Sequence, residues 1–180
     1  ALFRLGDAYF ELAARERGDA RRASFARAAS AYERATSRTQ NKGDIYFLSL
    51  YKLGWAYYNQ ATQTNTGAYD QAVQTFGRLV EDYDKLTPEQ QARLGLKGEA
   101  IEYMAVAFTQ VGGAEAANRF FSQPGRGQYK VTVLQRVAES LRDQGDFTRA
   151  VQAYEALLQE APNDSSSLRA AQEIVDIYQN

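Results

Sequence analysis

The sequence contains no cysteine and no histidine, and only three of its 180 residues are proline. Without cysteine the chain forms no disulfide. Without either residue type it has no Cys or Cys/His zinc site and no Cys or His nucleophile. The lack of cysteine fits an oxidising compartment but is also common in the cytosol. Because proline interrupts helices, its scarcity leaves almost the whole chain free to be helical.

Long apolar runs are missing as well. The longest notable one, Tyr103–Phe108, is far shorter than the roughly 18 residues of a transmembrane helix, so we expect no direct membrane span. The sequence has no glycine-rich phosphate loop, metal-ligand cluster or nucleophile motif. The paired acids Glu99 and Glu102 share one face of a predicted helix, which is typical of a solvated surface. We therefore predict no enzyme activity, no cofactor and no metal.

The charge of the chain is nearly balanced, with a net value of −1, but it is unevenly spread. Residues 1–40 hold eight arginines against five acids, and residues 141–180 hold three arginines against seven acids. Such polarity can orient a partner, but solvated helix faces are the simpler explanation. Nucleic-acid binding through the arginine-rich segment 15–38 is the weaker interpretation, because few aromatic residues interleave it and the whole chain is slightly acidic. We expect no nucleic-acid partner.

Good helix formers dominate what the sequence does contain: alanine, leucine, arginine, glutamate and glutamine. Two segments share the pattern L-G-x-x-Y, at Leu5 and Leu53, and weaker copies begin at Met104 and Val137. Small residues let two antiparallel helices approach closely, and a large residue fills the space beside the crossing. The pattern therefore predicts an all-α chain of helix pairs. Each copy is followed by A-x-x-x-aromatic: Ala28 with Tyr32, Ala72 with Phe76, Ala117 with Phe121, and Ala150 with Tyr154.

These small/large pairs resemble the tetratricopeptide-repeat (TPR) family, and the resemblance extends over about residues 2–178. It implies a right-handed superhelical solenoid of about four helix pairs plus a terminal helix. A four-helix bundle is a weaker alternative, because it does not need the small/large pairs. The A-x-x-x-aromatic patterns recur after 44, 45 and 33 residues, whereas the family's period is about 34. We attribute the longer intervals to insertions around 15–24 and 59–66 and to a long helix over 88–111.

The pattern predicts nine helices in a single solenoid over residues 1–180, expected to be part of a longer array. The terminal helix is either a capping helix or the first half of a fifth repeat. We expect it to pack on the fourth pair through an apolar stripe formed by Leu168, Ala171, Val175 and Tyr178. The predicted pairs are about 2–38, 43–84, 88–122 and 128–160. Their helices are 2–16, 20–38, 43–62, 68–84, 88–111, 114–122, 128–143 and 147–160, and the terminal helix is 165–179.

The TPR resemblance also implies a binding surface, because in that family the first helix of each pair lines a concave groove that holds a partner. Carried over by register, the groove has an aromatic half and a polar half. Its aromatic stripe, residues 51, 55 and 58, either faces the groove or packs as core, and both interpretations stay open at this point. The implied groove residues are Phe3, Asp7, Phe10, Tyr51, Trp55, Tyr58, Glu102, Val106, Thr109, Gln135, Glu139 and Arg142.

The function implied by the resemblance is that of a protein–protein interaction scaffold, whose partner is another protein or a peptide segment. The alternative is a regulatory or sensory TPR module that binds a signalling peptide and changes conformation. The stretches Tyr51–Tyr58 and Tyr69–Phe76 are similar to TPR proteins of the Gram-negative cell envelope, which implies an envelope or periplasmic location. The sequence alone assigns no oligomeric state.

Overall fold

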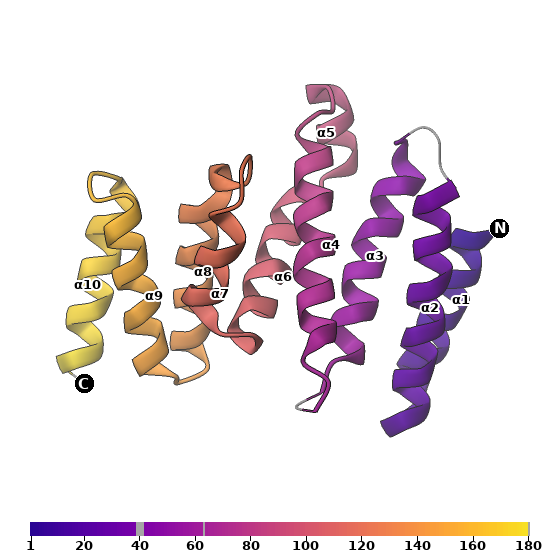
Figure 1. The fold of residues 1–180 in the computed structure, drawn as a ribbon, viewed down its shortest axis with the longest axis horizontal. Helices are drawn as coiled ribbons and strands as arrows, with labels where there is room; N and C mark the ends of the chain where they lie inside the picture. The colour runs from indigo at the N-terminus through magenta and orange to yellow at the C-terminus, as the bar shows by residue number, and fades with distance from the viewer. Residues whose placement is uncertain (39–41, 63, 180) are drawn as a thin grey trace. The chain divides into compact units, whose positions relative to one another are not determined.

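The computed structural model describes residues 1–38, 42–62 and 64–179, and these residues are built from α-helices (Figure 1). They form ten α-helices and one short 3-10 helix, with no strand beyond an isolated bridge between Thr62 and Asn65. The predicted all-α fold is confirmed. In chain order the elements are α1 (Leu2–Arg15), α2 (Gly18–Arg38), α3 (Asp44–Gln60), α4 (Gly67–Tyr83), α5 (Pro88–Leu94), α6 (Lys97–Gln110), α7 (Gly113–Phe121), η1 (Gly127–Tyr129), α8 (Lys130–Asp143), α9 (Phe147–Glu160) and α10 (Ser165–Gln179).

The chain divides into two compact units, Ala1–Ile101 and Glu102–Asn180, and α6 runs from one into the other. In the first unit, α1 to α4 each pack on the next helix in chain order. In the second unit, α7 packs on α8, α8 on α9, and α9 on α10. This consecutive packing is that of a TPR-type helical solenoid, as predicted. That all 180 residues form a single solenoid stays a prediction.

The crossings of α1 with α2 and of α3 with α4 depend on glycine. A Cβ atom added at Gly6 would lie 2.5 Å from the ring of Tyr32, and one added at Gly54 would lie 2.6 Å from the ring of Phe76. Both rings are fully buried. Real Cβ atoms do not approach ring carbons this closely in a packed interior, so only glycine permits these crossings. The prediction that helices approach at small residues is confirmed for the first two pairs.

Gly54→Ala should therefore destabilise the chain by about 1–3 kcal/mol, because the added methyl group overpacks a buried ring. Gly98→Ala is the matched control, since Gly98 is also helical but an added Cβ would meet nothing within 4 Å. That change should be neutral or stabilising by up to about 1 kcal/mol. Urea unfolding followed by circular dichroism measures both variants. Equal free energies of unfolding would show that the crossing tolerates a side chain.

The single helix predicted over 88–111 is in fact two helices, α5 and α6, so the predicted total of nine is wrong: the described residues hold ten. The break falls at Gly95, which ends α5 at a φ of +62°, in the left-handed region that favours glycine. The predicted start is confirmed, because Thr87 and Gln90 form a reciprocal capping box. The first helix of the third pair is thus α6, and α5 is an additional helix. Residue 63, within the predicted insertion, lies outside the described residues.

The terminal helix α10 packs with a different face from the one predicted. Its buried residues are Ser167 and Ala170. The Ser167 hydroxyl donates to the Ala161 carbonyl at 2.5 Å, which turns this polar side of the helix toward α9. Amphipathicity identifies an apolar stripe but not the neighbour that covers it. The expectation that the stripe packs on the fourth pair is wrong, since all of its residues are exposed: Leu168, Ala171, Val175 and Tyr178.

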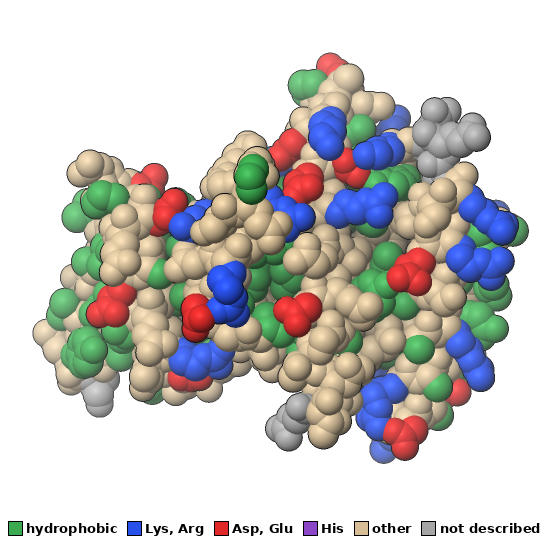
Figure 2. All heavy atoms as spheres, in the orientation of Figure 1, with side chains coloured by type: hydrophobic (Ala, Val, Ile, Leu, Met, Phe, Trp, Pro, Cys, Tyr) green, Lys and Arg blue, Asp and Glu red, His purple; other side chains and the backbone are tan. Residues whose placement is uncertain are grey.

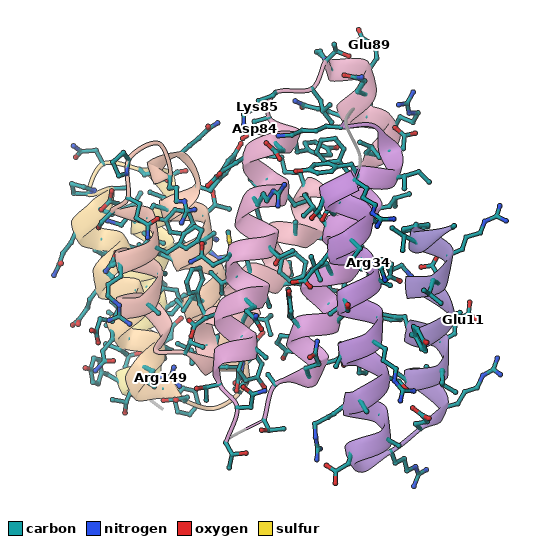
Figure 3. All side chains as sticks on the ribbon, turned by 45° about the vertical axis from the view of Figure 1, so that its right-hand side comes forward. Glu11, Arg34, Asp84, Lys85, Glu89 and Arg149 are labelled. Carbon is teal, nitrogen blue, oxygen red and sulfur yellow. The ribbon has the colours of Figure 1, made fainter. Side chains whose placement is uncertain are left out.

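A buried carboxylate joins the start of α3 to the end of α4. Asp82, which is 5% exposed, accepts hydrogen bonds from Lys42 Nζ at 2.7 Å and Tyr46 Oη at 2.6 Å. It also accepts from Lys85 Nζ at 3.0 Å, at the end of α4 where Figure 3 labels that lysine. Burial on its own raises the pKa of Asp82, but these hydrogen bonds outweigh it and lower the pKa from 3.8 to about 2.

Because the pKa of Asp82 is lower in the folded chain than in the unfolded one, its ionised form stabilises the fold above about pH 4. This contribution is lost as the pH falls through 2. Asp82→Asn should therefore cost on the order of 2 kcal/mol at pH 7 and far less in strong acid. Urea unfolding at both extremes of pH measures the difference, with Glu11→Gln, an exposed acid on α1, as the control. A cost for Asp82→Asn that does not change with pH would contradict the assignment.

Candidate partner-binding faces

A lysine links the first helices of the first two pairs, α1 and α3. Lys52 Nζ lies 3.8 Å from Asp7 Oδ1 and 5.0 Å from the centroid of the Phe10 ring. Asp7 also accepts a hydrogen bond from Tyr32 Oη at 2.7 Å. Lys52 thereby contacts both a carboxylate and an aromatic ring of the preceding pair. Two of the predicted groove residues, Asp7 and Phe10, therefore lie together on one face with Lys52.

The two phenylalanines of α1 in the predicted groove are each half-buried against the second helix of their pair. The ring centroid of Phe3 lies 5.9 Å from that of Tyr32, and the centroid of Phe10 lies 5.1 Å from that of Phe25. Each ring thus contributes to the packing of α1 on α2 and still leaves part of its surface exposed.

The aromatic stripe of α3, which consists of Tyr51, Trp55 and Tyr58, is half-buried along its whole length. At one end, Tyr51 Oη donates to Glu99 Oε2 of α6 at 2.5 Å. The rings of Trp55 and Tyr58 meet edge to face at 6.0 Å, and Tyr58 lies 5.3 Å from Tyr69 of α4. Burial raises the pKa of the Tyr58 hydroxyl, which keeps it protonated. Neighbouring helices thus hold the stripe at both ends while part of each side chain stays exposed.

In the second unit, the predicted polar residues form a row of paired charges. Arg136 Nε lies 3.4 Å from Glu102 Oε2 on α6. Arg136 Nη1 lies 3.1 Å from Glu139 Oε2, one turn further along α8. Gln135 Nε2 donates to the other oxygen of Glu139 at 2.9 Å. The carboxylates on this face are therefore already engaged by donors of the chain itself.

The row of paired charges continues toward α10, where Arg142 Nη1 donates to Glu173 Oε2 at 2.6 Å. The predicted groove residues of α6 contribute less to it. Thr109 is 2% exposed, and its hydroxyl donates to the Val106 carbonyl at 2.8 Å. Arg149, labelled in Figure 3, donates from Nη2 to the Thr109 carbonyl at 2.6 Å. Thr109 thus has hardly any side-chain surface to offer a partner, whereas Val106 stays half-buried.

Comparison with known families gives two matches to the family described as Tetratricopeptide repeat, at residues 48–85 and 132–164. The first match covers most of α3 and all of α4, and the second covers most of α8 and all of α9. Both segments are tetratricopeptide repeats. Searches among curated proteins and among solved structures give no match. TPR units are protein–protein interaction modules, so the matches support a partner that is a protein.

The described residues were also compared with the requirements of other kinds of site. They contain no group of three or more Asp, Glu, His or Cys side chains placed to hold a metal ion. None of the described helices has the length and apolarity needed to cross a membrane. The hydroxyls of Tyr32 and Tyr57 donate to Asp7 and Glu33, and burial raises the pKa of both tyrosines. These phenols stay protonated and join helices to one another.

Tyr154 of α9 occupies the position that Tyr32 occupies in α2, since both close an A-x-x-x-Y pattern. Their hydroxyls have different surroundings. Tyr32 Oη donates to Asp7, whereas Tyr154 Oη is buried with no hydrogen-bond partner among the described residues. The acid at the corresponding position of the fourth pair, Glu139, is engaged by neighbours on its own helix instead. Burial raises the pKa of Tyr154 to about 12.

The two tyrosines therefore make a matched pair for substitution. Tyr32→Phe should cost about 1–3 kcal/mol, because it removes a hydrogen bond to a carboxylate. Tyr154→Phe should be neutral or slightly stabilising, because it removes a buried hydroxyl that has no partner. Thermal unfolding of both variants measures the difference. Equal losses would mean that the Tyr154 hydroxyl has a partner in solution, with Glu139 the nearest candidate by register.

Three charged residues outside the predicted groove set belong to these faces: Lys52, Arg136 and Glu173. Lys52 directly follows Tyr51, and Arg136 directly follows Gln135. A predicted stripe widened by one residue would have included both. Glu173 lies on α10, where the resemblance assigned no groove residue, and the sequence carries no local signal for it.

Proposed function

We propose that this chain is a non-enzymatic scaffold that binds a segment of another protein on the faces of its first helices. The observation that carries the proposal is the aromatic stripe of α3. Tyr51, Trp55 and Tyr58 contact neighbouring helices or each other, yet each keeps part of its surface exposed. Rigid, half-exposed aromatic side chains are frequent anchors of protein interfaces, because they contribute a large contact area and lose little conformational entropy on binding.

Beside the stripe, the face of the first unit offers charged groups at an apolar surface. The side chains of Lys52 and Asp7 are 36% and 31% exposed, and the ring of Phe10 lies next to them. A bound segment can place an apolar side chain on the rings and a polar group on the lysine or the carboxylate. The ligand that fits this face is therefore a peptide segment in which aromatic or aliphatic residues alternate with polar ones.

The face of the second unit favours a different contribution. Its charges are already paired, as Arg136 is with Glu102 and Glu139, and Arg142 is with Glu173. A partner must exchange its own charges for these pairs, which yields little net affinity but penalises a wrong charge pattern. We infer that this face contributes selectivity, and that its contribution weakens as salt concentration rises.

We further propose that the scaffold works in the bacterial cell envelope. This rests on the similarity of the stretches Tyr51–Tyr58 and Tyr69–Phe76 to TPR proteins of Gram-negative envelopes. Recovery of the tagged protein in the periplasmic or envelope fraction of a Gram-negative host strain supports the proposal, and recovery with the cytosolic marker contradicts it.

The test of the binding function starts from a phage-displayed peptide library. Peptides are selected on the immobilised chain, counter-selected on the Trp55→Ala variant and then synthesised. Their dissociation constants are measured by fluorescence anisotropy. We expect Trp55→Ala to weaken binding at least about tenfold, which corresponds to about 1.4 kcal/mol, because it removes an interface anchor. The melting temperature should change little.

Phe147→Ala is the matched control, since Phe147 is a 53% exposed aromatic residue on α9, outside the predicted groove set. It should leave the dissociation constant unchanged. Two results would contradict the assignment of the stripe. In one, Trp55→Ala unfolds the chain, as loss of a core aromatic residue does at a cost of about 3–5 kcal/mol. In the other, the variant folds and binds peptides as the parent chain does.

A further inference from the structure

The side of α10 that carries the apolar stripe is the largest exposed apolar feature of the second unit. Leu168, Val175 and Tyr178 are 81%, 45% and 75% exposed. Together with Ala171 they recur every three or four residues, so they line one side of the helix. We call these four residues the α10 stripe. Figure 2 shows hydrophobic side chains gathered over α9 and α10. Contiguous exposed apolar surface of this kind marks an interaction site.

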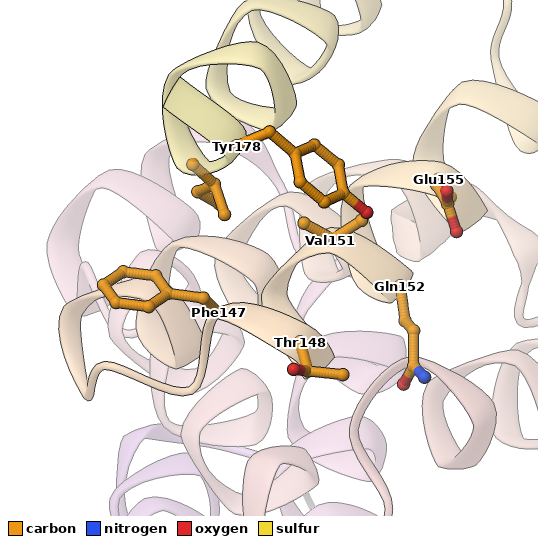
Figure 4. Close-up of a pocket in the computed structure, with 7 residues that line it drawn as sticks. Phe147, Thr148, Val151, Gln152, Glu155 and Tyr178 are labelled. Atoms are coloured by element: carbon orange, nitrogen blue, oxygen red, sulfur yellow. The ribbon is translucent and has the colours of Figure 1, made fainter. Parts of the chain in front are cut away.

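A pocket of about 400 Å³ opens beside the C-terminal half of the stripe. Figure 4 shows the ring of Tyr178 lying over Val151, with Phe147 projecting from the start of α9. The pocket and the stripe share Tyr178, so one helix laid along α10 can contact both. The lining residues are Phe147, Thr148, Val151, Gln152, Glu155, Ile177 and Tyr178.

The flank of the stripe indicates what kind of helix fits there. Arg169 and Asp176 are two turns apart on the same side of α10, next to the stripe. If a second α10 runs antiparallel about a two-fold axis near residues 172–173, each arginine lies beside the aspartate of the other copy. In the same register Leu168 meets Tyr178 and Ala171 meets Val175. The helix is thus complementary to itself in both charge and apolar pattern.

We propose that the α10 stripe is the interface of a homodimer, in which α10 packs antiparallel on the α10 of a second copy. In the first two pairs the following helix covers the first helix at its glycine, as Tyr32 does at Gly6 and Phe76 does at Gly54. Among the described residues no helix covers the α10 stripe, and the second copy supplies that cover. Leu168 of each copy then lies against the pocket beside Tyr178 of the other. An interface of this size is small, so the dimer is weak, with a dissociation constant in the micromolar range.

Sedimentation equilibrium of the 180-residue chain, from micromolar to hundreds of micromolar, tests the proposal. The parent chain should pass from monomer to dimer over this range. Val175→Glu should weaken the dimer at least about tenfold, because it brings two like charges close to the two-fold axis. Leu5→Glu is the control: Leu5 is a 43% exposed apolar residue on α1 and should leave dimerisation unchanged. Circular dichroism confirms that each variant is folded.

A charge swap tests the antiparallel register. Arg169→Glu alone and Asp176→Arg alone should each weaken the dimer about two- to fivefold, because each sets two like charges side by side. The double variant restores the pair with its signs exchanged and should regain the parent affinity. Failure of the double variant to recover overturns the register. A chain that stays monomeric throughout, or a dimer indifferent to Val175→Glu, overturns the interface itself and leaves the stripe to a helix from another source.

Discussion

The close approach of paired helices at Gly6 and Gly54 is the constraint on which the first unit depends. A side chain at either position would collide with a fully buried ring, so each glycine must face the second helix of its pair. Successive helical residues are turned by about 100°. The residues that directly follow the glycines, Asp7 and Trp55, are therefore directed to the side of the crossing. The candidate binding face of the first unit is in this sense a geometric consequence of how its core packs.

The fourth pair shows what changes when the small residue is alanine. Ala138 is fully buried at the position that Gly6 holds in the first pair, and it carries the Cβ atom that Gly6 lacks. The ring of Tyr154 cannot occupy the place relative to α8 that Tyr32 occupies relative to α1, because that place is now filled. The hydroxyl of Tyr154 is left without a partner, and Glu139 pairs along its own helix. One methyl group thus separates a hydrogen-bonded crossing from an apolar one.

The sequence predicts the helix pairs well because the small/large pattern encodes contacts within a pair. It does not predict the break between α5 and α6, since a helix interior tolerates glycine and only the backbone angle at Gly95 distinguishes a cap from a continuous helix. Nor does it predict which side of α10 faces α9, because apolarity does not name the neighbour that covers it. The same limit applies to the candidate site. The register places Trp55 and Glu139 on first-helix faces, but the partners of Lys52 and Arg136 belong in part to other helices, and no local pattern encodes them.

The contacts that hold the two faces also determine what binding costs. Tyr58 is fixed by Tyr69, and Asp7 by Tyr32, so the first unit presents its groups already ordered and a partner loses little entropy in engaging them. In the second unit the same kind of fixation consumes the binding groups themselves, since Glu139 already accepts from Gln135 and Arg136. A ligand there must break one hydrogen bond for each that it forms. Prior ordering therefore favours binding on the aromatic face and opposes it on the charged one, so affinity should concentrate in the first unit although both units share one fold.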